Sequence, residues 1–362
     1  MMISAMTLDP DLLWIPGHPS SSQASAFRTR INSRYSINLA TYADLWKWSC
    51  NHRGAFWGEV WDYEEVIGSK GSGEVVIETV SPSANPPWFP DASLNWAENQ
   101  LRHHSTYPDN IAIIQTSETC PGHIPSTRRI AQRELYQSVG RTQRAMRDAG
   151  VCKGDRVAFW GGNCAGAVIV LLATSALGGI FSSAAADFGV DGVVERLEQI
   201  RPKLLFVTNG VVYAETPRPL LPLLPALLGR LTVPPERTVV IEHLPASLVP
   251  ISPGLQGKKV ENWDDFLDKG DGEVEFTRMG FNEPIWILFS SGTTGEGSSS
   301  WVEFELMMRL GKPKAIVHRQ GGMLLDSLRE HHLAGDVTRG DVYLYYTTPY
   351  VSLKPRSLML LC

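Results

Sequence analysis

The amino-acid sequence predicts an α/β fold in which mostly parallel sheets are flanked by helices. From about residue 110 onward, short apolar runs alternate with longer segments of helical periodicity. This order requires crossover connections, which are right-handed and join parallel strands. The strand candidates are nearly continuous apolar runs, which is typical of a parallel sheet buried on both faces.

The first hundred residues are rich in tryptophan and precede this pattern. Residues 42–49 have a helical pattern, with Leu45 and Trp48 three positions apart, and residues 56–61 continue it. A further helix is predicted to begin within residues 94–99. Tryptophans at helical spacing are expected to form core contacts rather than a ligand site.

The alternating region contains the main elements. Strands are predicted at the short apolar runs 111–114, 156–160, 180–183, 204–207, 239–241 and 284–289. Helices are predicted between them, with glycine or proline at their ends, at 133–149, 164–177, 190–200 and 217–231. Residues 161–186 carry no charge, but their serine, threonine and glycine content favours a buried helix followed by a buried strand over a membrane span.

Composition excludes several functional classes. The net charge is −5 and no basic block is present, so nucleic acid is not an expected partner. The 11 Trp, 10 Tyr and 12 Phe residues argue against long disordered stretches. The five cysteines are scattered without a C-x-x-C pair, which predicts reduced thiols in a cytoplasmic protein and neither a disulfide framework nor a zinc site.

The most informative stretch directly follows the predicted strand 284–289. It consists of Ser290, Ser291, Gly292, Thr293, Thr294 and Gly295. The glycines allow backbone N–H groups to curl around an anion, and the hydroxyls add further hydrogen-bond donors. Lys314 lies further along the chain, and would supply a cation. The composition alone also fits a flexible Ser/Gly linker. The spacing around Gly311 and Lys312 excludes a Walker-type phosphate loop.

A hydroxyl- and glycine-rich loop after a strand fits the rule that open α/β sheets bind ligands outside the carboxyl ends of their strands. The loop together with Pro313, Lys314 and Ala315 resembles the signature S-S-G-T-T-G-x-P-K-A of the adenylate-forming superfamily, the acyl-CoA synthetases. Residues 88–99 resemble the entry segment of its acetate and acetoacetate branches. Residues 187–193 and 199–203 resemble the acetoacetate branch in particular.

The resemblance implies an acid–thiol ligase that converts ATP, acetoacetate and CoA into acetoacetyl-CoA, AMP and pyrophosphate through an acyl-adenylate. ATP with Mg²⁺ and CoA are the implied cofactor and co-substrate, and the implied partners are these small molecules. The six loop residues would hold the ATP phosphates, and Lys314 would place a positive charge on the β- and γ-phosphates. An acetate-type ligase and a non-catalytic nucleotide-binding fragment are the alternatives.

The sequence departs from the family pattern in two places. Residues 296–311 interrupt the signature between Gly295 and the lysine segment. Enlarging the loop from about 8 to about 24 residues costs only about 1 kcal/mol of closure entropy, but a catalytic group misplaced by about 1 Å can lose about a hundredfold in rate. The family pattern also stops after residue 348, before the segments for the adenylation lysine and the small C-terminal domain. Both odd segments are compatible with translated introns.

These departures predict an inactive fragment with three parts. An N-terminal extension covers residues 1–105, a partial AMP-binding large domain covers 106–348, and an aberrant tail covers 349–362. The resemblance assigns no catalytic or metal-binding residue within this sequence. Five further polar positions receive structural interpretations. We expect His318 to be structural and His331 and His332 to form a solvated helix face, and we expect Asp187 and Asp191 to cap a helix.

Overall fold

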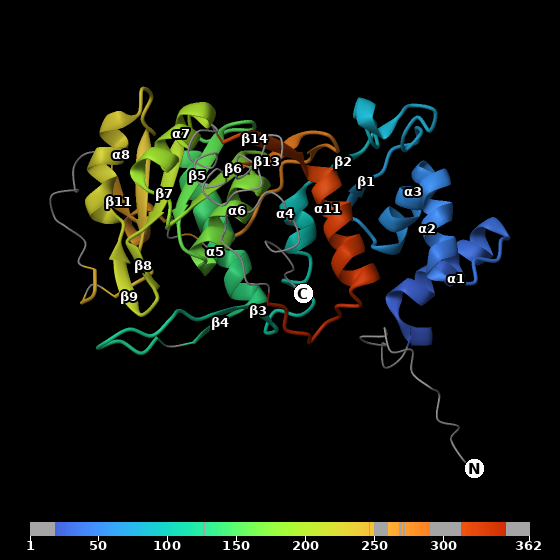
Figure 1. Cartoon of the computed structure of the whole chain (residues 1–362), viewed down its shortest axis with the longest axis horizontal. Helices are drawn as coiled ribbons and strands as arrows, with labels where there is room; N and C mark the ends of the chain where they lie inside the picture. The colour runs from blue at the N-terminus through green and yellow to red at the C-terminus, as the bar shows by residue number, and fades with distance from the viewer. Residues whose placement is uncertain are drawn as a thin grey trace, which may run out of the picture.

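The computed structural model describes residues 19–125, 127–245, 247–249, 260–267, 270, 272–289 and 313–344. Its centre is a seven-stranded sheet with the order β11-β10-β7-β5-β6-β13-β14 (Figure 1). All neighbouring strands pair in parallel except β13 and β14, which are antiparallel. The strands are β5 (Arg156–Gly161), β6 (Ile180–Ala185), β7 (Leu204–Thr208), β10 (Arg237–Ile241), β11 (Val260–Asn262), β13 (Pro284–Phe289) and β14 (Ala315–Arg319). The mostly parallel sheet predicted from the sequence is therefore confirmed.

Helices cover both faces of this sheet (Figure 1). Along β5, Val157 and Phe159 pack into one hydrophobic core, while Ala158 and Trp160 pack into the other. This alternation is what a pleated strand buried on both faces produces. The first core receives α5 (Gln132–Asp148) and α6 (Ala165–Ala176), and the second receives α7 (Val190–Ile200) and α8 (Leu224–Arg230).

The N-terminal helices share the first of these cores. They are α1 (Gln23–Tyr35), α2 (Tyr42–Asn51) and α3 (Arg53–Tyr63). In Figure 1 they lie beyond α4 (Trp96–Gln100) and α11 (Gln320–Leu328), which separate them from the sheet. As predicted, Leu45 and Trp48 form the buried side of α2, whereas Trp46 is 60% exposed. Helix α11 continues into the short π-helical segment η5 (Arg329–Ala334).

Small sheets and short helices complete the described part of the chain. A three-stranded sheet contains β1 (Gly68–Ser69), β2 (Ser93–Leu94) and β12 (Met279–Gly280); two hairpins pair β3 (Ile111–Gln115) with β4 (Arg128–Ala131), and β8 (Gly210–Tyr213) with β9 (Thr216–Pro219). The strand predicted at 111–114 therefore exists but lies outside the main sheet. The short helices are η1 (Pro19–Ser21), η2 (Pro82–Ala84), η3 (Leu221–Leu223) and α9 (Trp263–Phe266).

The structure differs from the prediction at 217–231 and agrees with it at 161–186. The helix predicted over 217–231 is wrong in its first part, because Ala214 and Glu215 both adopt positive φ and form a tight hairpin turn that leads into β9; helix α8 begins only at Leu224. The uncharged stretch 161–186 contains α6 and β6, as predicted, both packed against the sheet core. Within the described ranges, no helix has the length and apolarity needed to span a membrane.

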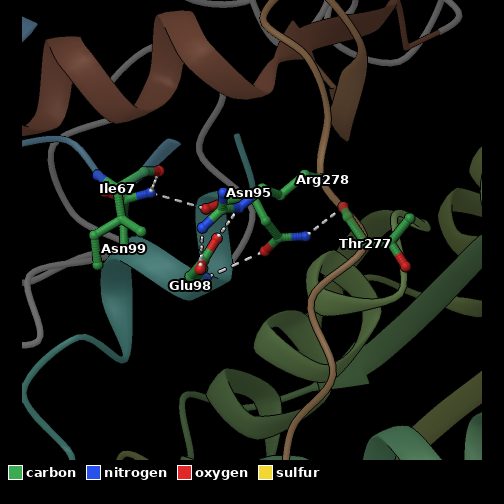
Figure 2. A network of polar contacts seen from close by, with 6 residues as sticks. All are labelled: Ile67, Asn95, Glu98, Asn99, Thr277 and Arg278. Atoms are coloured by element: carbon green, nitrogen blue, oxygen red, sulfur yellow. Dashed lines mark hydrogen bonds and ion pairs between the residues drawn. The ribbon is translucent and has the colours of Figure 1, made fainter. Parts of the chain in front are cut away.

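A polar network centred on Asn95 joins the N-terminal part to the sheet domain (Figure 2). Asn95 is fully buried; its side-chain oxygen accepts from the Glu98 N–H at the start of α4. Its Nδ2 group donates to the carbonyls of Ser175, Ala176 and Thr277 at 3.0, 3.3 and 2.8 Å. In the same network, Arg278 forms a double hydrogen bond with the Glu98 carboxylate, and Asn99 exchanges two hydrogen bonds with the backbone of Ile67.

Candidate active site

The candidate site lies at the carboxyl edge of the main sheet. Since β5, β6, β7, β10, β11 and β13 run parallel, their carboxyl ends meet at one edge, where ligands of open α/β sheets bind. Strand β13 reaches this edge at Phe289, which is buried among α7 and α8. The chain therefore leaves the sheet at this edge immediately before the hydroxyl- and glycine-rich loop.

The pairing of β13 with β14 positions the lysine of the signature. Phe289 lies opposite Ala315 in the antiparallel register, and Lys314 directly precedes Ala315. Lys314 thus lies at the carboxyl edge, next to the point at which β13 ends, and its side chain is exposed. Ser290, Ser291, Gly292, Thr293, Thr294, Gly295 and the interrupting segment 296–311 lie outside the described residues, as does the tail 349–362.

This geometry bears on the long interruption between Gly295 and Lys314. Strand pairing sets where Lys314 stands relative to Phe289, whatever the number of residues in between. Because closure entropy grows only slowly with loop length, the interruption itself costs about 1 kcal/mol. A lysine at this edge presents a strongly hydrated point charge, which suits a phosphate group.

A cavity of about 890 Å³ opens at the same edge, on the side covered by α5 and α6. None of the described signature residues lines it. Burial raises the pKa of the Cys164 thiol to about 11, so this thiol is neutral at pH 7 and a poor nucleophile. Burial also lowers the pKa of His243, which keeps its imidazole neutral. These two residues and Arg141 line a polar cavity that sequence reasoning missed, because they come from segments distant in the chain with no common motif.

The other polar positions singled out from the sequence have varied surroundings. Asp191 lies in the first turn of α7 and forms an ion pair with Arg230, while the helix N-cap is Gly189 without a side-chain cap. Asp191 therefore places a carboxylate at the helix N-terminus, as expected, but neither Asp187 nor Asp191 is the N-cap residue. His318 lies within β14, and burial lowers the pKa of its imidazole, so it is neutral and packed near Trp286.

The prediction that His331 and His332 form a solvated face is wrong. His331 is 3% exposed, and its ring packs edge-on against Tyr343. Nδ1 of His332 donates to a Glu64 carboxylate oxygen at 2.9 Å, and this hydrogen bond raises the pKa of the His332 imidazole. The reason is that η5 packs against α1 and the end of α3, so its polar side is covered by the N-terminal helices.

Comparisons with known proteins agree with this arrangement. The model of the AMP-binding enzyme family matches residues 101–297, which is more than half of the chain. The chain therefore belongs to the AMP-binding enzyme family. The matched range contains the parallel strands and the signature up to Gly295.

Several individual proteins of this family are similar to the chain. Acetoacetyl-CoA synthetase of Rattus norvegicus is 35% identical over 94% of this chain and 48% of its own length. Malonamoyl-CoA synthetase vrtB of Penicillium aethiopicum is also 35% identical, over 93% of this chain and 44% of its own. A solved structure of acetoacetyl-CoA synthetase from Streptomyces lividans matches with a TM-score of 0.77 and 29% identity, covering 91% of this chain and 46% of that one. The chain spans about half the length of the relatives that it matches.

Proposed function

We propose that this chain is the nucleotide-binding part of an acid–thiol ligase that activates acetoacetate. The observation that carries the proposal is the juxtaposition of Phe289 and Lys314 at the carboxyl edge of a sheet that belongs to the AMP-binding family. The names of the relatives support acetoacetate as the acid. In this proposal ATP transfers AMP to the carboxylate, pyrophosphate leaves, and the CoA thiol then displaces AMP.

The chain's own residues would act on the phosphates. Ser290, Ser291, Thr293 and Thr294 would donate hydrogen bonds, Gly292 and Gly295 would let the backbone approach, and Lys314 would stabilise the charge that develops on pyrophosphate. The exposed lysine beside the strand end fits an anionic phosphate. Mg²⁺ would enter on the ATP phosphates, because it is usually bound by one or two carboxylates together with substrate phosphates.

The proposed domain boundaries are those predicted from the sequence. Residues 1–105 would form an extension and 106–348 the adenylation part, with 296–311 as an insertion; a family match that begins at residue 101 supports the first boundary. We propose small molecules as the only substrates and the cytoplasm as the location, since the net charge is −5 and the four described cysteines are free thiols.

A second short-chain acid is the alternative substrate. The malonamoyl-CoA synthetase relative has the same identity to this chain as the rat acetoacetyl-CoA synthetase. Identity over this half of the relatives therefore does not separate one acid from another. Exchange of pyrophosphate into ATP distinguishes these acids when it is measured with acetoacetate, acetate and malonamate in turn, on a version without residues 296–311 that is extended to the full length of the relatives. Acetoacetate should give the highest rate.

A nucleotide titration tests the phosphate-binding proposal without requiring turnover. We expect the 362-residue chain to bind Mg·ATP, and Lys314→Ala to weaken binding about tenfold, as loss of a charge-assisted contact does. The matched control is Lys47→Ala, which removes an exposed lysine from α2 in the N-terminal part. Equal affinity of Lys314→Ala and the wild type would refute the assigned role of Lys314.

A further inference from the structure

Helix α7 contacts the chain just before the phosphate loop. Arg196 on this helix is only 9% exposed, and its Nη1 donates to the Gly192 carbonyl at 2.6 Å. The guanidinium carbon lies 4.1 Å from the ring centroid of Phe188 and 5.6 Å from that of Phe289. A desolvated guanidinium over an aromatic face is attracted by the ring quadrupole. Arg196 therefore holds Phe289, the residue that directly precedes Ser290.

The same helix also contacts the chain just before the signature lysine. Gln199 donates through Nε2 to the Pro313 carbonyl at 3.0 Å and shares this group with the Glu195 carbonyl at 3.1 Å. Pro313 is buried and directly precedes Lys314. Residues three apart on a helix lie on one face, so Arg196 and Gln199 are adjacent on α7.

We propose that Arg196 and Gln199 form a clamp that holds both ends of the segment 290–312 and thereby positions Lys314. The inference rests on the proposed function, in which Lys314 contacts phosphate. Arg196 and Gln199 are positioning residues, because they contact Phe289 and Pro313 and act on the nucleotide only through Lys314. The clamp makes the position of the lysine independent of the length of the intervening segment.

Strand β14 needs this second attachment. It is the edge strand of the main sheet and pairs only with β13 among the described residues. Its Ile316 and Val317 side chains are 36% and 57% exposed, so little packing secures it. An edge strand held on one side is prone to local opening. The Gln199 bond to Pro313 anchors the chain just before β14 to α7, whose buried side packs on the sheet.

Hydrogen exchange of the peptide that covers residues 313–319 tests the clamp directly. We expect Gln199→Leu, which keeps size but removes the donor, to speed exchange in this peptide about 2- to 10-fold, as loss of one hydrogen bond does. Glu195→Ala is the matched control, because its exposed side chain lies on the same helix. Arg196→Met is the second variant, with the thermal midpoint measured in parallel. Unchanged exchange in Gln199→Leu would overturn the clamp.

A double-mutant cycle with Mg·ATP links the clamp to the lysine. We expect Gln199→Leu to weaken ATP binding about 2- to 10-fold in the wild type and to have no effect in the Lys314→Ala background, since it acts through Lys314. Equal weakening in both backgrounds would refute this route. If the wild type binds no ATP, the proposed function fails, while the exchange measurement still decides whether the clamp exists.

Discussion

Replacement of Asn95 tests how the N-terminal part is attached to the sheet domain. Its amide is fully buried and combines two roles: the oxygen caps α4, and the nitrogen donates to three carbonyls. The carbonyls of Ser175 and Ala176 keep backbone donors from Gly178 and Thr277 after truncation. The Thr277 carbonyl loses the bond of 2.8 Å that Asn95 provides.

The expected cost of Asn95→Ala follows from these contacts. Loss of an N-cap costs about 1 kcal/mol, and a buried carbonyl left unpaired costs about 1–3 kcal/mol. The free energy of unfolding should therefore fall by about 2–4 kcal/mol, measured by urea denaturation with an unchanged slope. Asn95→Asp separates the two roles, because aspartate caps as well as asparagine but turns a carboxylate toward three carbonyl oxygens.

We expect Asn95→Asp to be more destabilising than Asn95→Ala at pH 7. The control is Ser22→Asp, at the N-cap of α1, where the cap accepts from Ser25 N–H and no acidic residue follows in the first turn. That change should alter the free energy of unfolding by less than about 0.5 kcal/mol. An Asn95→Asp variant as stable as the wild type would show that Asn95 acts only as a cap and that its Nδ2 hydrogen bonds, part of the network in Figure 2, add no stability.

Three further outcomes are expected. Gly140→Ala should destabilise the protein despite the higher helix propensity of alanine, because the new Cβ would lie 1.8 Å from the Gly272 carbonyl oxygen; a raised melting temperature would contradict this. The hydrogen bond with Glu64 raises the pKa of His332, so protonated His332 stabilises the folded protein. This stabilisation is complete below about pH 6.5 and is lost as pH rises through the folded-state pKa. His332→Gln should therefore make the free energy of unfolding, measured by urea denaturation, less dependent on pH. Cys164, with a pKa of about 11, should alkylate far more slowly than the exposed cysteines, as followed by mass spectrometry.

The core of the fold was predictable because its strands are continuous apolar runs. Strands β5, β6, β7, β10 and β13 each fall on a run identified from the sequence, since burial on both faces leaves no polar alternation to confuse the pattern. The direction of β14 was not predictable from such a run. Periodicity reports burial and element type, whereas strand direction depends on pairing across a long connection.

The candidate site was predictable only in part. The signature indicated Lys314 because glycines, hydroxyls and a lysine form a local pattern. Arg196 and Gln199 carry no such pattern, and their contacts with Phe289 and Pro313 arise only when α7 packs beside β13. His331 was misjudged for a similar reason, because its burial depends on how the N-terminal helices cover η5.

Hydrogen exchange with and without Mg·ATP tests whether the nucleotide binds beside Lys314 and the end of β13. We expect ATP to slow exchange in the peptides covering 284–319, which contain the end of β13, the proposed phosphate loop and Lys314. Protection should be lost in Lys314→Ala at the same ATP concentration. Protection confined to residues 240–245 and 262–267, which line the 890 Å³ cavity, would place the nucleotide in that cavity and refute the phosphate-binding role of Lys314.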